Sequence, residues 1–429
     1  MKQLHLETAF LANGWANDVL LSIDDNGVIT DITTDTPASV ASAEHVSGIA
    51  IPGMVNVHSH AFQRAFAGLS EFRTGEHDSF WTWRKLMYDF VEKLTPEQIY
   101  ETAFGLYSEL KQFGYTWVGE FHYVHNAPDG KPYDDRSCLA DAVIRAAQDA
   151  GIGICLLPVL YQRGGFNDEP LAPAQKRFYL DDDSFLNLVS DLKTRYGEAR
   201  NVEVGIAFHS VRAVSIDTIR RVTDAWRTMK PNGVIHIHVA EQTKEIEDCV
   251  AATGRRSVEY LMSEVNVDEH WCLIHATHIT TDEIRTIADR KAIVGICPTT
   301  EANLGDGIFP ASEFLKSGGR FAIGSDSHVS VSPRSELRLL EYGQRLTARS
   351  RAILGTRTES VGTRLYTRSA RAGAAAIGVS TGQIKIGHRA DLVMLDRAHP
   401  VLDDCPDERV FDRLVFCDAG NPVRELSRW

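Results

Sequence analysis

Two histidines, His58 and His60, close a short apolar run near the start of the chain. On an extended strand, side chains two positions apart project from the same face, so both imidazoles can reach one metal ion. A His-x-His pair alone is a weak signal, because a buried histidine is more often a hydrogen-bonded core residue than a metal ligand. The pair gains meaning only from partners elsewhere in the sequence.

Similar residues recur where later apolar runs end, at His238 and at Asp326. If these run ends meet, three imidazoles and one carboxylate come together, a set that suits Zn²⁺. The predicted ligands are His58, His60, His238 and Asp326. We expect one ion per chain, and Fe²⁺ suits the same set. His236 is the alternative ligand, because it lies two residues before His238 and so shares its face.

Two further residues, Glu241 and His275, follow run ends without being needed as ligands. Glu241 lies three residues after His238, where its carboxylate can carry a proton from water to a leaving nitrogen. It can also cap the helix that is expected to begin nearby. His275 is placed to hydrogen-bond the attacking water, and Asp326 to help remove its proton. The predicted catalytic residues are therefore Glu241, His275 and Asp326.

The middle of the chain alternates apolar runs with helical patterns. The apolar runs, expected to be strands, cover residues 50–57, 115–121, 152–160, 202–208, 234–239, 271–274, 292–296 and 321–323. Helices are expected over residues 95–114, 137–150, 183–196, 215–229, 280–290 and 332–350. Eight buried strands alternating with helices predict an α/β fold, a (β/α)8 TIM barrel, whose strand ends converge on one active-site rim. The alternative is an open doubly wound sheet, although no glycine-rich phosphate turn follows the first strand.

Both ends of the chain carry short strand-like runs instead. Near the N-terminus, Asn26 and Gly27 form a dipeptide typical of hairpin turns, between runs at residues 19–23 and 28–32. Near the other end, a similar pattern covers residues 382–387, 390–396 and 410–417. We expect residues 1–49 and 380–429 to form one composite β-sandwich domain, and residues 50–379 to form a metal-dependent hydrolase barrel.

The charge balance excludes several classes of function. The 429 residues carry 45 Lys and Arg against 58 Asp and Glu, a net charge of −13 with neutral histidines. An acidic chain lacks the basic face needed to bind nucleic acid or an anionic membrane, and no run approaches the roughly 18 apolar residues of a membrane span. The seven cysteines form no Cys-x-x-Cys pair, which favours reduced thiols and a cytoplasmic location.

Several motifs together resemble the amidohydrolase superfamily, in its mononuclear-zinc deaminase branch. They are PGMVNVHSHAFQR, HVAE, LIHATH and IGSDSH in the barrel region, and GQIKIGHRADLV in the expected small domain. Within that branch, the chain most resembles the formimidoylglutamate deiminases in the segments SHAFQRAFAGL, FWTWRKLMY, HYVHN and HSVRAV. The resemblance implies zinc-dependent deimination of N-formimino-L-glutamate to N-formyl-L-glutamate and ammonia, in histidine degradation, by a homodimer.

The same resemblance implies a set of substrate-binding residues: Gln63, Arg84, Tyr123, His209 and Arg212. The expected substrate is a small dianionic amidine, and two fork-shaped guanidiniums suit two carboxylates. Gln63 offers both a donor and an acceptor to the formimino nitrogens. Two of these residues have a structural alternative, because Arg84 can stack on neighbouring tryptophans and Tyr123 can be a rim aromatic.

Other functions stay open at this point. Deaminases of guanine, cytosine or adenosine derivatives share the metal chemistry, but their neutral rings do not need a pair of arginines. A triazine chlorohydrolase is disfavoured for the same reason, and an imidazolonepropionase would act on a ring amide. A non-catalytic barrel scaffold is the remote alternative, and its expected sign is the loss of a ligand or of the Glu241 carboxylate.

Overall fold

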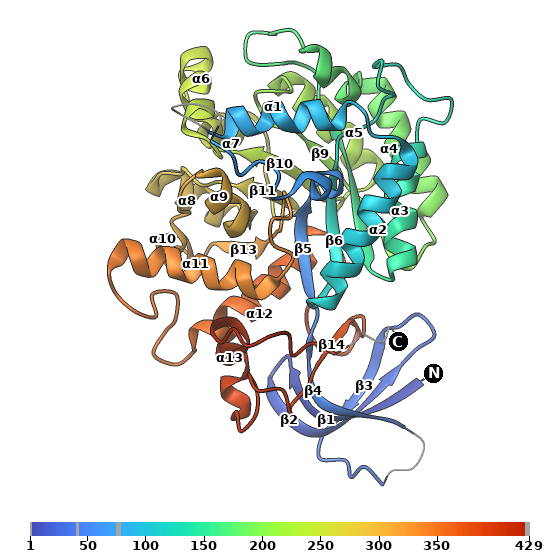
Figure 1. Ribbon diagram of the computed structural model, residues 1–429, viewed down its shortest axis with the longest axis vertical. Coiled ribbons are helices and arrows are strands. Elements are labelled where there is room, and N and C mark those ends of the chain that lie inside the picture. Colours follow the sequence, from blue (N-terminus) through green and yellow to red (C-terminus); the bar gives the residue numbers. More distant parts are fainter. Residues whose placement is uncertain (1, 40–42, 74–78, 425–429) are drawn as a thin grey trace.

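A computed structural model describes residues 2–39, 43–73 and 79–424 of the protein (Figure 1). Its larger part is a parallel sheet curled into a barrel and surrounded by helices, with a smaller sheet at one end. The barrel strands, in their order around the sheet, are β13 (Arg320–Ile323), β12 (Ile293–Ile296), β11 (Trp271–His275), β10 (Ile235–Val239), β9 (Ile206–Phe208), β7 (Gly153–Leu160), β6 (Tyr115–His122) and β5 (Met54–Ser59). The two ends of this order meet at a bridge between Ser59 and Asp326. The predicted barrel is therefore confirmed, and the open doubly wound sheet is wrong.

The barrel strands are short and buried on both faces. Every residue of β6, β7, β10, β11 and β12 is buried, because the barrel interior covers one face and the helices cover the other. One predicted strand is two in the structure, since Gly205 separates β9 from β8 (Val202–Val204), which pairs with β7. A Cβ at Gly205 would lie 2.6 Å from Val234 and 2.7 Å from Leu157, so the close packing there requires glycine.

Six helices occupy the positions expected from the sequence. They are α2 (Pro96–Gln112), α3 (Cys138–Ala150), α4 (Asp182–Tyr196), α5 (Ile216–Met229), α8 (Thr281–Asp289) and α11 (Pro333–Ala348). A capping box begins α2, because the side chains of Thr95 and Gln98 accept each other's backbone N–H. The structure adds the helices α1 (Phe80–Val91), α6 (Thr243–Thr253), α7 (Ser257–Glu264), α9 (Pro298–Leu304), α10 (Ala311–Lys316) and α12 (Val361–Ala376). It also adds the 3-10 turns η1 (Ala61–Phe66), η2 (Pro173–Phe178) and η3 (Asp407–Arg409).

The smaller sheet joins the two ends of the chain. Its order is β14-β4-β1-β2-β3, and the strands are β1 (Lys2–Leu11), β2 (Gly14–Ile23), β3 (Ile29–Thr33), β4 (Glu44–Pro52) and β14 (Leu392–Leu395). β2 and β3 form the antiparallel hairpin predicted around Asn26 and Gly27. β14 pairs antiparallel with β4, so the sheet is composite. β4 continues to Pro52 before β5 begins, so the run at residues 50–57, predicted as one barrel strand, belongs to two sheets.

Two predictions for the C-terminal region are wrong. Residues 410–417 were expected as a strand but form helix α13 (Val410–Phe416). The reason is that four apolar residues recur at helical spacing and are buried on one face: Val410, Phe411, Leu414 and Val415. Residues 382–387 contribute an isolated bridge from Ile384 to Leu11 instead of a strand. The described strands of the small domain form one sheet, to which both ends of the chain contribute.

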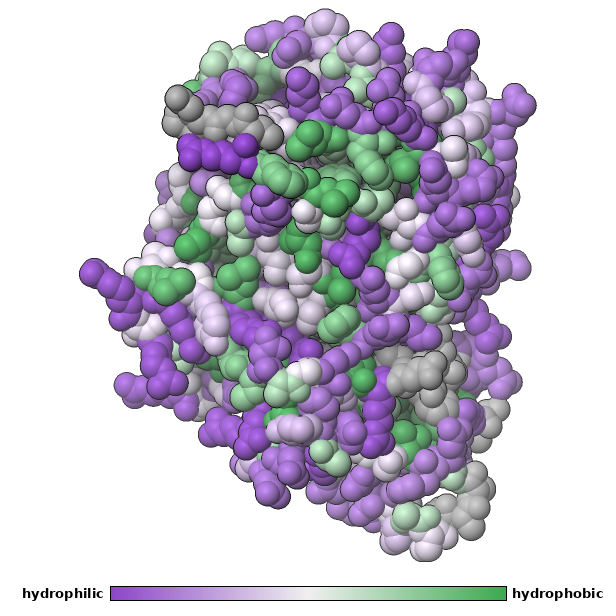
Figure 2. Space-filling view, viewed as in Figure 1, coloured by the Kyte–Doolittle hydropathy of each residue, from purple (hydrophilic) through white to green (hydrophobic). Residues whose placement is uncertain are grey.

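Helix α1 lies across the mouth of the barrel, at the top of Figure 1. Its buried residues are Met87 and Val91, whereas Leu86 is 43% exposed. Figure 2 shows apolar side chains gathered over this helix on a face that is otherwise largely polar. None of the described helices combines the length and the hydropathy that a bilayer crossing requires. One face of α1 therefore holds it to the barrel, and the other is turned outward.

Gly53 is the position at which the chain passes from the small sheet to the barrel, and it has no room for a side chain. A Cβ there would overlap the Thr116 side chain and lie 2.9 Å from the carbonyl oxygen of Asp391. We expect Gly53→Ala to lower the free energy of unfolding by about 1–3 kcal/mol, because overpacking forces the surroundings to shift. Denaturant unfolding of the purified variant measures this change.

Gly105→Ala is the matched control for this experiment. Gly105 lies inside α2, and, apart from its chain neighbours and the backbone of its own helix, no described atom lies within 4 Å of the position of its added Cβ. Alanine in a helix interior is more favourable than glycine by about 0.5–1 kcal/mol, so this variant should be slightly more stable. Equal unfolding midpoints for the two variants would contradict the close contact at Gly53.

Candidate active site

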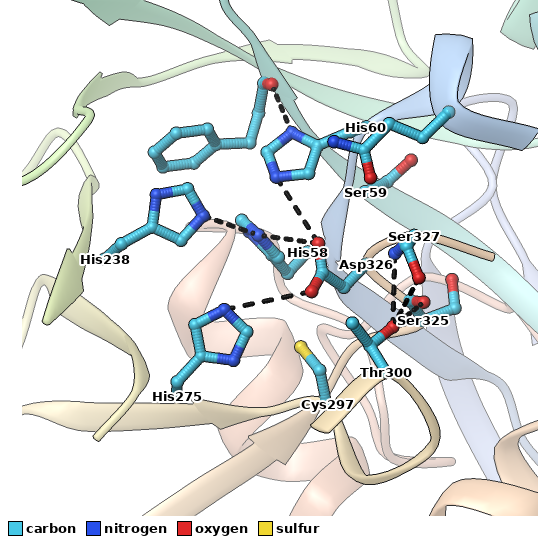
Figure 3. A network of polar contacts seen from close by, with 12 residues as sticks. His58, Ser59, His60, His238, His275, Cys297, Thr300, Ser325, Asp326 and Ser327 are labelled. Carbon is cyan, nitrogen blue, oxygen red and sulfur yellow. Dashed lines mark hydrogen bonds and ion pairs between the residues drawn. The ribbon is translucent and has the colours of Figure 1, made fainter. Parts of the chain in front are cut away.

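The four predicted metal ligands lie together at the carboxyl-terminal end of the barrel (Figure 3). His58 is in β5 and His60 just follows it, His238 is in β10, and Asp326 follows β13. The Nε2 atoms of His58 and His238 are 3.0 Å apart. Asp326 Oδ1 lies 3.5 Å from His58 Nε2 and 3.4 Å from His60 Nε2. All four side chains are buried. His58, His60 and Asp326 form one group of ligand atoms that could hold a metal ion, and His58, His238 and His275 form a second group that shares His58.

The hydrogen bonds of these histidines show that the group suits a cation. His60 Nδ1 and His238 Nδ1 donate to backbone carbonyl oxygens over 3.0 Å and 2.9 Å. Because a carbonyl cannot donate, each neutral ring keeps its Nε2 without a proton; that of His60 lies 3.4 Å from Asp326 Oδ1, and that of His238 lies 3.0 Å from His58 Nε2. Burial lowers the pKa of His58, His60 and His238, which disfavours their protonation. Three imidazoles and one carboxylate with free lone pairs fit Zn²⁺.

His275 has a different environment from the other three histidines. Its Nε2 lies 3.7 Å from Glu241 Oε1 and 3.8 Å from Asp326 Oδ2. Its Nδ1 lies 3.3 Å from Glu301 Oε1. Burial opposes the charged form of His275, but the three carboxylates outweigh burial and raise its pKa to about 10. A protonated imidazole donates from both nitrogens, so His275 faces the ligand group as a hydrogen-bond donor.

Left-handed backbone conformations direct two of these side chains. His275, at the end of β11, has φ +68°, and Asp326, after β13, has φ +50°. Such a conformation costs a non-glycine residue about 1–3 kcal/mol and persists where the surrounding contacts hold it. At these two positions, the left-handed backbone lowers the stability of the fold and turns a polar side chain into the barrel mouth.

Glu241 lies beside His275 at the edge of the group. Burial raises the pKa of the Glu241 carboxyl to about 7. The N-cap position of α6 is Gln242, and the carboxylate of Glu245 accepts the backbone N–H groups of Ala240 and Glu241. The cap is thus made by other residues, and the Glu241 side chain faces His275. A carboxyl group that titrates near neutral pH can both accept and release a proton there.

Three other histidines near the site have structural partners. His236 Nε2, the alternative ligand, lies 2.8 Å from a backbone carbonyl oxygen at the end of α12. His278 Nε2 lies 2.7 Å from another backbone carbonyl oxygen. His328 lies between two serine hydroxyls, at 3.0 Å and 2.8 Å from its two ring nitrogens. Their contacts account for them as core residues around the ligand group.

A cavity of about 720 Å³, its open mouth included, leads from the ligand group to the surface. The structure brings all the predicted substrate residues to its wall: Gln63, Arg84, Tyr123, His209 and Arg212. Gln63 Nε2 donates to the Tyr123 hydroxyl over 3.0 Å. Gln63 Oε1 is buried and has no hydrogen-bond partner among the described residues. A buried acceptor without a partner is suited to a donor on a ligand.

Three polar residues at the site were left out of the sequence-based set: Tyr88, Tyr161 and Glu301. Tyr161 directly follows β7, and Glu301 lies in α9, the helix after β12. Both residues come after the carboxyl-terminal end of a barrel strand, where active-site residues are expected, so the sequence did contain a signal for them. Tyr88 lies one turn after Arg84 in α1. Arg84 also stacks as its structural alternative suggested, with its guanidinium carbon 5.4 Å from the Trp81 ring centre.

Glu120, at the end of β6, holds the segment that carries the first two ligands. Its carboxylate accepts hydrogen bonds from Ser59 Oγ, from Ala61 N over 2.8 Å and from Tyr107 Oη over 2.9 Å. Ser59 lies between the two ligand histidines, and Ala61 follows the second, so these contacts flank the pair. Hydrogen-bonding partners of this kind fix the orientation of metal ligands.

Comparisons with known proteins agree on one family. The model of the amidohydrolase family matches residues 49–417, and that of the N-terminal domain of the formimidoylglutamate deiminase HutF matches residues 1–45. The chain belongs to the amidohydrolase family. Within this family it belongs with the formimidoylglutamate deiminases, since the Pseudomonas aeruginosa formimidoylglutamate deiminase is 45% identical over 433 residues, 100% of this chain and 94% of the relative.

Solved amidohydrolase structures share the fold. An amidohydrolase from Brucella melitensis has a TM-score of 0.90 at 41% identity, over 97% of this chain and 91% of that chain. An adenosine deaminase from Xanthomonas campestris, with bound zinc, has a TM-score of 0.80 at 21% identity, over 98% and 90% of the two chains. The second likeness is one of fold alone. A shared barrel leaves the substrate to be argued from the pocket.

Removal of the Glu120 carboxylate should weaken metal binding. Glu120→Ala leaves the N–H of Ala61 and the hydroxyl of Tyr107 without their acceptor. The segment that carries the first two ligands, residues 58–61, is then no longer held by the Glu120 carboxylate. We expect zinc affinity, measured by competition with a chelator, to fall about 10- to 100-fold, as for other partners of metal ligands. Tyr107→Phe is the control, because it removes one hydrogen bond and leaves the segment held, and its affinity should stay within about threefold. An unchanged affinity in Glu120→Ala would contradict this role.

Proposed function

We propose that the protein hydrolyses the formimino group of N-formimino-L-glutamate, giving N-formyl-L-glutamate and ammonia, in histidine degradation. The observation that carries the proposal is that one cavity contains both the candidate ligand group and two arginines, Arg84 and Arg212. A dianionic amidine needs this combination, with metal-assisted hydrolysis at one end and two guanidiniums for two carboxylates at the other. The name of the Pseudomonas aeruginosa relative describes the same activity.

The residues that would hold Zn²⁺ are His58, His60, His238 and Asp326. When bound, the ion lowers the pKa of a water molecule from about 15.7 towards 7. Asp326 accepts a proton from the water as its oxygen attacks the formimino carbon, and His275 donates a hydrogen bond to that oxygen. Glu241 passes this proton and the second proton of the water to the nitrogen, which leaves as ammonia. One water is consumed, and its oxygen stays in the formyl product.

The remaining pocket residues recognise the substrate. Gln63 Oε1, the buried acceptor, receives an N–H of the formimino group, while the Gln63 Nε2 contact to Tyr123 fixes the orientation of the amide. Burial lowers the pKa of His209 well below its ordinary value, so this ring is neutral and can donate to a carboxylate from one nitrogen. Arg84 and Arg212 bind the two carboxylates.

The cofactor and the assembly are parts of the same proposal. We propose one Zn²⁺ per chain, with Fe²⁺ as the alternative for the same ligands. A cytoplasmic homodimer is likewise a prediction carried over from the sequence. Deaminases of guanine, cytosine or adenosine derivatives are the alternative activity, and they are disfavoured because a neutral ring leaves two guanidiniums without anionic partners.

The direct test is ammonia release by the purified, zinc-loaded protein. N-formimino-L-glutamate should release ammonia rapidly, whereas guanine and cytosine should release none, because they lack carboxylates for the arginines. The protein stripped of metal by a chelator should be inactive and should regain activity with added zinc. Turnover of a base without turnover of the formimino compound would overturn the proposed substrate and keep the metal chemistry.

Glu241→Gln should retain zinc and lose turnover. Glutamine keeps the shape of the side chain but cannot carry a proton, and general acid–base groups contribute about 10²- to 10⁴-fold to rates. We therefore expect kcat to fall by about that factor, with metal content, measured by elemental analysis, unchanged. Glu247→Gln, a change elsewhere in α6, is the control and should keep full activity. A kcat near that of the wild type in Glu241→Gln would remove Glu241 from the proton path.

A further inference from the structure

Two arginines of the cavity act on one phenol oxygen, that of Tyr161. Arg84 Nη2 donates to Tyr161 Oη over 3.2 Å, and Arg212, which lines the same cavity, acts on Tyr161 through its positive charge. Tyr161 directly follows β7 and is 1% exposed. Arg84 comes from α1 and Arg212 from the loop after β9. A single side chain at a strand end thus interacts with two guanidiniums that come from separate elements, with Arg84 by a hydrogen bond and with Arg212 by charge.

Gln175, in η2, fixes this acceptor in place. Gln175 Oε1 accepts a backbone N–H over 2.8 Å, and this contact determines which end of the amide is the donor. Its Nε2 therefore donates to Tyr161 Oη over 2.8 Å and to Tyr88 Oη over 3.1 Å. Tyr88 also accepts from Arg84 Nε. The two tyrosines, Gln175 and Arg84 form one partly buried hydrogen-bond network at the cavity, with Arg212 beside it.

Two donors surround the Tyr161 hydroxyl. Gln175 and Arg84 donate to Tyr161 Oη, and together they occupy the two lone pairs of a neutral hydroxyl. Burial opposes ionisation, but the charges of Arg212 and Arg84 outweigh it and hold the pKa of Tyr161 below its ordinary value. Burial raises the pKa of Tyr88 to about 12. The charges of both arginines therefore act on Tyr161.

The hydrogen-bond partners of the two arginines are neutral oxygen atoms and not carboxylates. Among the described residues, their hydrogen bonds go to Tyr88, Tyr161 and the carbonyl oxygen of Gly164, and no ion pair joins either guanidinium to an acidic side chain. Two neighbouring positive charges repel each other and cost free energy when buried. An acceptor between them offsets that repulsion and sets their separation, while the other guanidinium N–H groups stay free for a ligand.

We infer that Tyr161 is a specificity-determining residue, which holds Arg84 and Arg212 at the separation that receives the two carboxylates of the dianionic amidine proposed above. Tyr161 acts on the substrate through the arginines, so its effect belongs to binding and not to the hydrolytic step. Loss of the oxygen should therefore raise KM for a substrate with two carboxylates. It should change kcat little, because the metal ligands and Glu241 stay in place.

Steady-state kinetics of Tyr161→Phe with two substrates tests this inference. The substrates are N-formimino-L-glutamate and the same chain without the α-carboxylate, 4-(formimino)aminobutyrate. We expect KM for the first to rise about tenfold, as for the loss of a hydrogen bond to a charged group, with kcat within about threefold. KM for the second should change less than about threefold, so the preference for two carboxylates falls. An unchanged or lower KM for the dianion, or equal changes for both substrates, would overturn the inference.

Two more variants separate positioning from general damage. Tyr179→Phe changes a tyrosine that is 43% exposed and lies just after η2, and it should match the wild type. Gln175→Met keeps the volume but removes the donor, so it should shift KM in the same direction as Tyr161→Phe and by less. Combining Tyr161→Phe with Arg84→Met should raise KM by less than the product of the single effects, because both act through one contact. Fully multiplicative effects would contradict the shared contact.

The proposed activity and this inference fail in different ways. If the wild type does not release ammonia from N-formimino-L-glutamate, the substrate proposal is wrong. If the wild type is active and Tyr161→Phe has unaltered kinetics and an unaltered melting temperature, the activity stands and the role of Tyr161 is wrong. If Tyr161→Phe melts earlier and loses kcat for both substrates equally, its role is structural.

Discussion

The rest of this structure depends on one buried group of hydrogen-bond acceptors, which are the Nε2 atoms of His60 and His238 and the carboxylate of Asp326. His60 and His238 each use one ring nitrogen to donate to a backbone carbonyl, which leaves the other nitrogen as an acceptor. This acceptor lies beside the Asp326 carboxylate in His60 and beside His58 Nε2 in His238. Water is largely excluded at this depth, and burial works against protonation of the rings. The arrangement is costly without a cation and favourable with one, so metal binding and the stability of this end of the barrel are linked.

The same residues close the barrel. β13 and β5 are the two ends of the strand order, and the backbone contacts between them run through the candidate ligands. Asp326 N donates to His58 O over 3.0 Å, and His60 N donates to Asp326 O over 3.2 Å. Beneath them, Asn56 Nδ2 donates to Ser325 Oγ over 2.6 Å. The last seam of the sheet is therefore made by the segments that carry the ligands, and any shift of that seam moves the ligand atoms with it.

The sequence predicted the parts of the site that depend on strand ends, and it failed where contacts between distant elements decide. His58, His238 and Asp326 could be found because parallel strands in a barrel point their carboxyl ends to one rim. The run at residues 410–417 is too short for its period to separate strand from helix, and packing against the barrel helices decided for a helix. Tyr88 gave no signal, because its importance comes from Gln175, 87 residues away in the chain.

Chemistry and recognition come from different layers of the molecule. The candidate ligands and His275 are fixed by strands or strand ends, which the adenosine deaminase from Xanthomonas campestris shares as a fold at 21% identity. Arg84 and Gln175 come from α1 and η2, outside the barrel sheet. Loops can change without disturbing the closed sheet, since few of their contacts support it. In the function proposed above, the arginine pair beside Tyr161 is a change at the rim that the barrel can accommodate, and it adapts the hydrolytic centre to a substrate with two negative charges.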